Sequence, residues 1–543
     1  MLPGLIALHQ TRDRGRAPDL VAAVDVGTAS ARAAIVDANG DFLARADAPF
    51  AMHRPDGDIA EHDSEAIWAA VCLATREAMS RCRAAPDEIT AISFDATCSL
   101  VVRAADGTPL PVSTTGEPAL DTIAWMDHRA QAEAAEATAT GHPVLAHTGG
   151  TFSPEMQVPK LMWLKRHLPG TWQRAGLIFD LVDFLCWRAS GNPSRSICTL
   201  TCKWTYLPHQ GGWQPDFLAT VGLDDLMARA GLPDSPAAIG ADLGPLTYDA
   251  ATGLGLTETC RVAMGLIDAH AGALGAVDPS RAAAEGGQLT LVGGTSSCVM
   301  ALSADPHPVP TVWGPFADAV LPGLWLNEAG QSATGGLLEY VLRTHSAGGA
   351  PTASRHAAVL ARIAECRKAE GDAYARRLHL LPDFHGNRSP LGQPRALGVV
   401  SGATLDESFD ALCRLYYRAA TAIAMGLRHN LETLADHGYQ TAEIHIAGGH
   451  THNPLLMELY ADVTGACLLE PATPDATLLG VAMVAATAVG HHADLPAAVS
   501  AMAPPTTVRR PNPALRTRHD HDYRIFHQML AHRAALDALI AAD

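Results

Sequence analysis

Residues 21–36 read VAAVDVGTASARAAIV, an apolar strand that ends at Asp25, a tight turn that begins at Gly27, and a second strand over residues 33–36. Asn39-Gly40 is a strong hairpin signal and predicts a third strand over residues 41–44. We therefore expect the chain to open as an antiparallel meander.

A second segment, residues 289–302, repeats this pattern as LTLVGGTSSCVMAL. Both segments consist of a strand, a Gly-Thr turn with a following serine, and a strand. The similarity is short enough to arise by chance; if it reflects a repeated topology, two like domains face each other across a cleft. A chain of 543 residues is also too long for a domain with a single hydrophobic core, so two large domains are expected.

Other elements alternate between helix and strand, as an α/β fold requires. Helical periodicity over residues 65–81 follows Asp63 or Ser64 as a cap, and residues 89–94 form a buried strand that delivers Asp95 at its end. A short strand over residues 261–266 runs into Asp268.

Composition and charge exclude several classes of protein. The formal net charge of −18 argues against a nucleic-acid partner, and no apolar run approaches the ~20 residues that span a bilayer. The chain starts with its apolar part before its charges, the wrong order for a signal peptide, so we interpret residues 1–19 as a loose extension.

The cysteines predict neither a disulfide framework nor a zinc site. Their count of 11 is odd, and Cys198 and Cys202 lie four residues apart with no second pair. We expect reduced thiols and a cytoplasmic protein.

The turn after the first strand carries polar groups suited to a phosphate. Gly27 lets backbone amides approach an anion, while Thr28, Ser30 and Arg32 add donors. The carboxylate of Asp25 could hold magnesium, directly or through water. The alternative is a hairpin with a polar turn and no ligand.

The turn around Gly294 and Thr295 has the same chemistry without the acid. By itself it is weak evidence, since glycine-rich turns are common. Paired with the first turn it is informative, because a transferring phosphoryl group needs donors from two sides.

Gly448-Gly449 follows a late strand over residues 443–447, and Asn453 is the expected N-cap of the helix after it. These glycines either contact a nucleotide or serve only a tight strand-to-helix turn. We interpret His450 and His452 as solvated loop histidines, since no third ligand accompanies them.

Asp268 lies between a strand and a run of small residues, where an aspartate usually caps a helix. Its neighbours make it a candidate general base. The sequence contains no GxxxxGK[ST] phosphate loop and no GxGxxG near a first strand, which argues against P-loop and Rossmann enzymes.

Together these motifs resemble the FGGY carbohydrate kinases, which have two actin-like (ribonuclease H-like) ATPase domains facing each other across a central cleft. The resemblance covers nearly the whole chain from Leu20 onward, through blocks in matching order: VDVGTASAR, FDATCSLVV, AWMDHRA, VPKLMWLK, GLIDAHAGALGA, VGGTSS, NEAGQSATGG and IAGGHTHNPLLMELYADVTG. It implies a sugar-binding and catalytic domain over residues 20–275 and a nucleotide-binding domain over residues 276–543.

The resemblance implies ATP and Mg²⁺ as cofactors and assigns roles to single residues. Asp268 would be the general base, and Asp25 and Asp268 would position the metal. Nucleotide and phosphate contacts would come from Gly27, Thr28, Ser30, Arg32, Gly294, Thr295, Gly448, Gly449 and Asn453. Sugar contacts would come from Asp95, Ala96, Trp125, Asp127, Arg129, Lys203, Asp268 and Glu328.

Within the family, FDATCSLVV, WMDHRA and the EAGQSA block are most similar to the pentulose kinase branch. This implies a ketopentose phosphorylated on its terminal hydroxyl, with D-ribulose first and L-ribulose, ribitol or another polyol as alternatives. A non-catalytic sugar sensor on the same fold is a rival that the presence of Asp268 disfavours. An actin-like chaperone would need a peptide-binding domain, for which the tail leaves no room. The family also allows a homodimer.

Overall fold

The computed structural model describes residues 19–55 and 57–541. Apart from Asp19, the extension predicted for residues 1–19 lies outside these residues. Among the residues that the structure describes, no helix is both long and apolar enough to cross a membrane.

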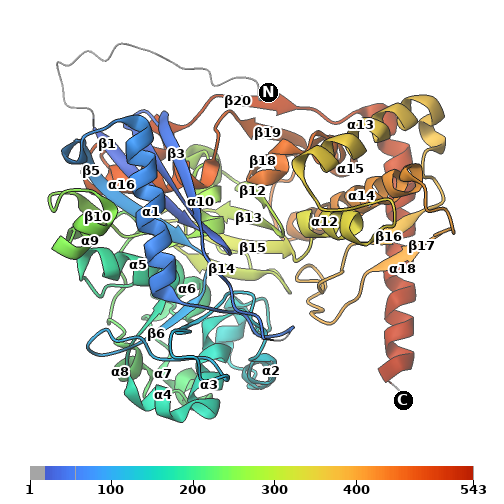
Figure 1. Cartoon of the computed structure of the whole chain (residues 1–543). Helices are drawn as coiled ribbons and strands as arrows, with labels where there is room; N and C mark the ends of the chain where they lie inside the picture. Colours follow the sequence, from blue (N-terminus) through green and yellow to red (C-terminus); the bar gives the residue numbers. More distant parts are fainter. Residues whose placement is uncertain (1–18, 56, 542–543) are drawn as a thin grey trace.

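The first half of the chain is built on a mixed sheet (Figure 1). Its strands, in spatial order, are β3 (Phe42–Pro49), β2 (Ser30–Asp37), β1 (Leu20–Val26), β5 (Ile89–Ala96), β10 (Arg261–Ala263) and β9 (Asp242–Pro245), with β11 (Leu266–Ile267) also paired to β5. β1, β2 and β3 form the predicted antiparallel meander, and β5 runs parallel to β1. β1 is buried along its whole length because the sheet is covered on both faces.

The second half repeats this plan. Its strands, in spatial order, are β14 (Trp313–Ala317), β15 (Trp325–Gln331), β13 (Ser297–Ser303), β12 (Gln288–Gly293), β18 (Glu443–Ala447), β19 (Cys467–Pro471) and β20 (Thr506–Arg509). The order β15-β13-β12-β18-β19 matches β3-β2-β1-β5-β10, with an antiparallel meander followed by two parallel strands in both. The predicted repeat of topology is confirmed.

Two smaller sheets lie outside these two. One contains β4 (Glu61–His62), β7 (Thr122–Ile123), β6 (Leu100–Ala104) and β8 (Ala175–Asp180), and the other β16 (His379–Leu381) and β17 (Val399–Ser401).

The helices cover the sheets and the smaller subdomains. Those before residue 290 are α1 (Ser64–Cys82), α2 (Gln131–Ala139), α3 (Gln157–His167), α4 (Pro169–Arg174), α5 (Leu181–Ser190), α6 (Ile197–Lys203), α7 (Pro215–Thr220), α8 (Leu226–Ala230), α9 (Tyr248–Leu254), α10 (Asp268–Leu274) and α11 (Pro279–Ala282). Those after it are α12 (Gly335–Thr344), α13 (Ala353–Glu370), α14 (Phe409–Ala435), α15 (Pro454–Thr464), α16 (Ala476–Ala488), α17 (Leu495–Met502) and α18 (Arg516–Ala541).

Local signals explain where several elements begin. The side chain of Asp63 accepts hydrogen bonds from the amides of Glu65 and Ala66, at 2.9 and 3.2 Å, and so caps α1 as predicted. The N-cap of α15 is Asn453, with proline in the first turn, which confirms that prediction too.

The two halves meet where α10 crosses α16 (Figure 1). α16 belongs to the second half, yet it packs against β1 and β5 of the first sheet. The backbones approach closely at glycines: a Cβ on Gly275 would lie 1.9 Å from the carbonyl oxygen of Ala476, and one on Gly480 would lie 2.1 Å from that of Ala271. Only glycine permits this crossing, which fixes α10, and with it Asp268, against both sheets.

Candidate active site

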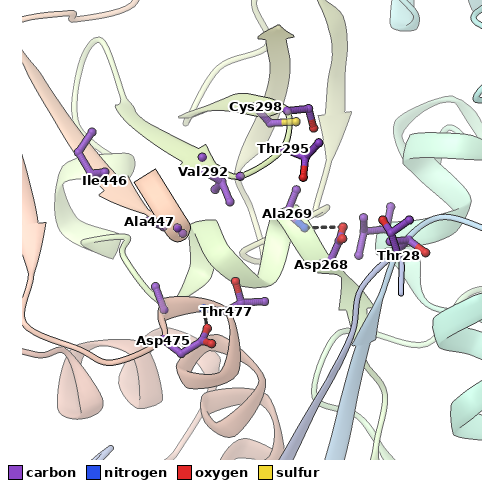
Figure 2. A pocket seen from close by; sticks show the side chains of 18 of the residues that line it. Thr28, Asp268, Ala269, Val292, Thr295, Cys298, Ile446, Ala447, Asp475 and Thr477 are labelled. Atoms are coloured by element: carbon purple, nitrogen blue, oxygen red, sulfur yellow. Dashed lines mark hydrogen bonds between the residues drawn. The ribbon is translucent and has the colours of Figure 1, made fainter. Parts of the chain in front are cut away.

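A cavity of about 580 Å³ lies between the two halves, a size typical of small-molecule sites. Side chains from different elements line it: Thr28 from the β1–β2 turn, Asp268 from α10, and Thr295 from the β12–β13 turn (Figure 2). The wall also includes Gly448 and Gly449 after β18. The two Gly-Thr turns of the repeat therefore open onto one cavity.

Three carboxylates converge where parallel strands of the first sheet end. Asp25 on β1 and Asp95 on β5 are direct neighbours in the parallel register, so their side chains lie on the same face. β11 pairs with the end of β5, and Asp268 follows β11 immediately as the first residue of α10. Asp268 itself lines the cavity, while Asp25 and Asp95 are fully buried behind it.

Burial and mutual repulsion raise the pKa values of these acids. Burial raises the pKa of Asp25 to about 6, against the opposing effect of Arg32. Burial, followed by the charges of Asp25 and Asp268, raises the pKa of Asp95 well above its ordinary value. Burial likewise raises the pKa of Asp268, although its carboxylate accepts a hydrogen bond of 2.7 Å from the amide of Ala269 (Figure 2).

Arg32 connects the two halves at this point. Its guanidinium forms an ion pair with Asp25 and contacts Asp475, with 3.3 Å between Nη1 and Oδ2. Arg45 also pairs with Asp475, at 2.9 Å. Asp475 caps α16 and lines the cavity. It was not predicted, because an aspartate before a helix usually serves only as a cap.

The side chain of Thr28 is held in place from the first half. The indole Nε1 of Trp125 donates to its hydroxyl at 3.2 Å. Lys160 is fully buried and donates to the carbonyl oxygens of Ala124 and Trp125, at 3.0 and 3.2 Å, which positions the segment that carries the indole. Trp125 lines the cavity beside Thr28, although we had predicted it only as a sugar contact.

The prediction that His450 is a solvated loop histidine is wrong. His450 is buried, with Nε2 2.8 Å from the carbonyl oxygen of Gly294 and Nδ1 3.0 Å from the hydroxyl of Tyr460. Burial lowers its pKa to about 4, so the imidazole is neutral at pH 7. It ties the Gly294 turn to the Gly448-Gly449 turn, whereas His452 is exposed as predicted.

Lys203 and Glu328 face each other at the other end of the cavity, with 3.6 Å between Nζ and Oε2. Burial favours the neutral form of Lys203, but Glu328, together with Cys98 and Cys202, outweighs burial and raises the pKa of the lysine above its ordinary value. In the same way, Lys203 and His270 outweigh the burial of Glu328 and lower the pKa of its carboxyl. Both groups are therefore charged and nearly inaccessible to solvent, as polar anchors for a small ligand would be.

Further groups at this end were not predicted. Arg388 pairs with Glu328 at 3.4 Å and with Glu155 at 3.2 Å, and the side chains of Arg388 and Lys203 both lie over the ring of Trp313. Arg388, Glu155 and Trp313 line the cavity. They come from loops and strands without a motif, so no local signal in the sequence identifies them.

Several predicted contacts lie outside the cavity wall. Asp127 and Arg129 form a buried ion pair of 2.7 Å, and Arg129 also pairs with Glu61 at 2.8 Å. The charged groups of Asp127 and Arg129 therefore bind each other and Glu61 within the first domain, and neither residue lines the cavity. The other predicted residues that do not line it are Asp25, Gly27, Ser30, Asp95, Ala96 and Asn453.

The acidic cluster fits a divalent cation such as Mg²⁺. Carboxylate oxygens are the ligands that this ion prefers. Burial first, and then the charges of neighbouring aspartates, raise the pKa values of Asp25 and Asp95, and a cation would offset both effects. Asp268 and, through water, Asp25 would hold it. The side-chain oxygens of Asp95 have no hydrogen-bond partner among the described residues.

Comparison with known proteins agrees with this architecture. The chain is 40% identical over 532 residues to an FGGY carbohydrate kinase domain-containing protein of Danio rerio, covering 94% of this chain and 97% of that protein. It is 35% identical to a D-ribulokinase of Saccharomyces cerevisiae, covering 86% of this chain and 71% of that one. A xylulose kinase structure from Rhodospirillum rubrum superposes with a TM-score of 0.76 at 23% identity, over 95% of this chain and 99% of that one.

The predicted fold is thereby confirmed: these sugar kinases share two actin-like ATPase domains. The N-terminal domain model of the FGGY family of carbohydrate kinases matches residues 20–275, and its C-terminal domain model matches residues 289–489. With the repeated sheets and the cavity between them, these matches show that the chain belongs to the FGGY family of carbohydrate kinases, enzymes that transfer a phosphoryl group to a hydroxyl of a sugar.

Proposed function

We propose that this protein uses ATP and Mg²⁺ to phosphorylate the terminal C5 hydroxyl of a ketopentose, D-ribulose first among the candidates. The observation that carries the proposal is the position of Asp268 in the cavity wall, together with the glycine turns and the Lys203–Glu328 pair. A carboxylate there can accept a proton from a sugar hydroxyl that faces a phosphate.

Asp268 is suited to the role of general base. Its pKa is raised by burial, so it accepts a proton more readily than an ordinary aspartate, and the amide of Ala269 holds one of its oxygens. General-base help of this kind contributes ~10²–10⁴-fold. A terminal primary hydroxyl is the least hindered group to bring against it.

The two glycine turns would cradle the phosphates of the nucleotide. Thr28 and Thr295 present hydroxyls from opposite halves, and Gly294, Gly448 and Gly449, which have no side chains, let a phosphate approach the backbone of the cavity wall. Bound Mg²⁺ would neutralise phosphate oxygens during transfer. We assign the nucleotide to residues 276–543 and the sugar and base to residues 20–275, with Glu328 and Trp313 of the second domain completing the sugar end of the cavity.

The charged end of the cavity would hold the far end of the sugar. Lys203 can donate to a keto oxygen, and Glu328 can accept from hydroxyls. The flat ring of Trp313 beside them offers an apolar face to the C–H groups of a sugar. Similarity to the D-ribulokinase of Saccharomyces cerevisiae supports a pentulose over glycerol.

The test is a substrate panel with ATP and a coupled assay for ADP. We expect the highest kcat/KM with D-ribulose among D-ribulose, L-ribulose, D-xylulose, ribitol and glycerol. A higher kcat/KM with L-ribulose would change only the proposed handedness of the substrate, and one with ribitol would change only its oxidation state. A tenfold preference for glycerol would contradict the pentulose assignment, whereas a tenfold preference for D-xylulose, itself a pentulose, would contradict the assignment to the ribulose and ribitol kinases.

Two further proposals concern the setting of the enzyme. A cytoplasmic location is supported by the eleven free cysteines, which suit a reducing compartment. A homodimer stays a prediction.

A further inference from the structure

Two cysteines and a histidine from distant parts of the chain meet behind the sugar end of the cavity. Cys198 and Cys202 lie one turn apart on α6, and His270 lies on α10. One ligand atom from each of the three lies within 4.8 Å of the other two, and all three residues are buried. From the spacing of the cysteines alone we had expected no zinc site, because the third ligand follows 68 residues after Cys202.

The histidine is oriented as a metal ligand. Its Nδ1 faces the Sγ of Cys198 at 2.9 Å, and its Nε2 faces the carboxylate of Glu328 at 3.7 Å. Metal-bound histidines commonly present their second nitrogen to a carboxylate, which fixes the ring and raises its basicity. Nε2 has no hydrogen-bond partner among the described residues, and its ion-pair contact there is with Glu328.

The donor set selects the kind of ion. Two thiolates and an imidazole suit a soft or borderline cation such as Zn²⁺, and not Mg²⁺, which prefers oxygen. A divalent cation with two thiolates has no net charge, which makes it compatible with a fully buried site. The amide of Ile267 points at the Sγ of Cys198 from 3.5 Å and would stabilise a thiolate there.

We propose that Cys198, Cys202 and His270 form a binding site for one Zn²⁺ ion, separate from the carboxylates that would hold Mg²⁺. Both thiols lose their protons to solvent on binding, and the neutral imidazole coordinates through Nδ1, which leaves one coordination position for water. Because Lys203 follows Cys202 directly and Glu328 faces His270, the ion would lie directly behind the sugar-binding end of the cavity.

Metal binding to purified, chelator-stripped enzyme tests this, with Zn²⁺ counted after gel filtration and Co²⁺ as a spectroscopic probe. We expect about one Zn²⁺ per chain, at least two protons released into weakly buffered solution, and a thiolate-to-cobalt charge-transfer band. In Cys202→Ser the band should vanish and Zn²⁺ affinity should fall more than about tenfold. The matched control is Cys186→Ser, another buried thiol, on α5, which should bind as the wild type does.

Two results would overturn the proposal: a wild-type protein with no thiolate–cobalt band, or a Cys202→Ser variant whose band matches the wild type. Circular dichroism shows whether each variant is folded. If Cys202→Ser fails to fold, the wild-type band and the proton count decide the question. The metal measurements need no substrate, so their outcome is independent of the kinase assay.

Discussion

The Nε2 of His450 lies 2.8 Å from the carbonyl oxygen of Gly294, and this contact joins the two glycine turns on the nucleotide side of the cavity. A Cβ on Gly293 would lie 2.1 Å from Nδ1 of the same ring, so the imidazole is packed directly against the β12–β13 turn. We infer that His450 positions both turns without touching the sugar.

Replacing His450 with alanine should therefore weaken nucleotide binding. The change removes the imidazole from the carbonyl oxygen of Gly294, which keeps the amide of Gly335 at 3.1 Å, so the cost is that of one hydrogen bond, about 0.5–1.5 kcal/mol. We expect KM for ATP to rise roughly 2- to 12-fold, while KM for the sugar stays within about twofold. His450→Gln can still donate from its amide and should recover part of the loss; equal increases in both KM values would contradict the positioning role.

The same histidine makes stability depend on pH. Its pKa is about 4 in the folded chain and about 6.5 when unfolded, so the unfolded state binds the extra proton first as pH falls. The stabilisation is complete above pH 6.5 and is lost as pH falls toward 4. Between pH 7 and pH 4, the free energy of unfolding measured in urea should fall by roughly 3 kcal/mol more for the wild type than for His450→Gln. Parallel pH curves for the two proteins would rule this out.

The crossing of α10 and α16 should tolerate no side chain at Gly480. A Cβ there meets only backbone, 2.1 Å from the oxygen of Ala271 and 3.1 Å from the nitrogen of Gly275, so the helices must separate. We expect Gly480→Ala to cost about 1–3 kcal/mol or more in unfolding free energy and to lower kcat, because α10 begins with Asp268. In the control, Gly170→Ala on α4, the new Cβ meets nothing within 4 Å. Similar stability for both variants would show that the crossing can adapt.

Lys203 should act on the sugar and not on the nucleotide. Lys203→Met keeps the apolar stem beside Trp313 but removes the charge that faces Glu328. A hydrogen bond to a charged group contributes about 1.5–3 kcal/mol, so we expect kcat/KM for the sugar to fall roughly 10- to 100-fold. Lys165→Met is the control, because that lysine pairs with Asp225 on the surface. An unchanged sugar KM with a raised KM for ATP would place the sugar elsewhere.

The antiparallel meander that opens the chain and the acids at the ends of later strands could be predicted from sequence, because each depends on local signals. The Gly-Thr turns, the Asn39-Gly40 hairpin and the cap at Asp63 are encoded within a few residues. The ends of parallel strands place Asp95 and Asp268 together once the sheet order is known. The family resemblance added Lys203 and Glu328, which no local pattern indicates.

What the sequence could not reveal depends on long-range packing. Arg388 reaches Glu328 across 60 residues, and His450 reaches Gly294 across 156. Asp127 and Arg129 match a motif, but the fold pairs them with each other and with Glu61, so a matching block did not guarantee a place in the cavity. His450 is buried and His452 is exposed, and no signal within this short polar loop of the sequence distinguishes the two.

The turnover of Asp268→Asn decides whether Asp268 takes the proton from the sugar hydroxyl. The amide keeps the size and can still contact Ala269, but it cannot accept the proton. Asp278→Asn is the matched control, because that aspartate caps α11 outside the cavity wall. We predict that Asp268→Asn keeps the fold and ATP binding and loses ~10²-fold or more in kcat, while the control keeps wild-type activity. A folded Asp268→Asn enzyme with more than about a tenth of wild-type turnover would contradict the account.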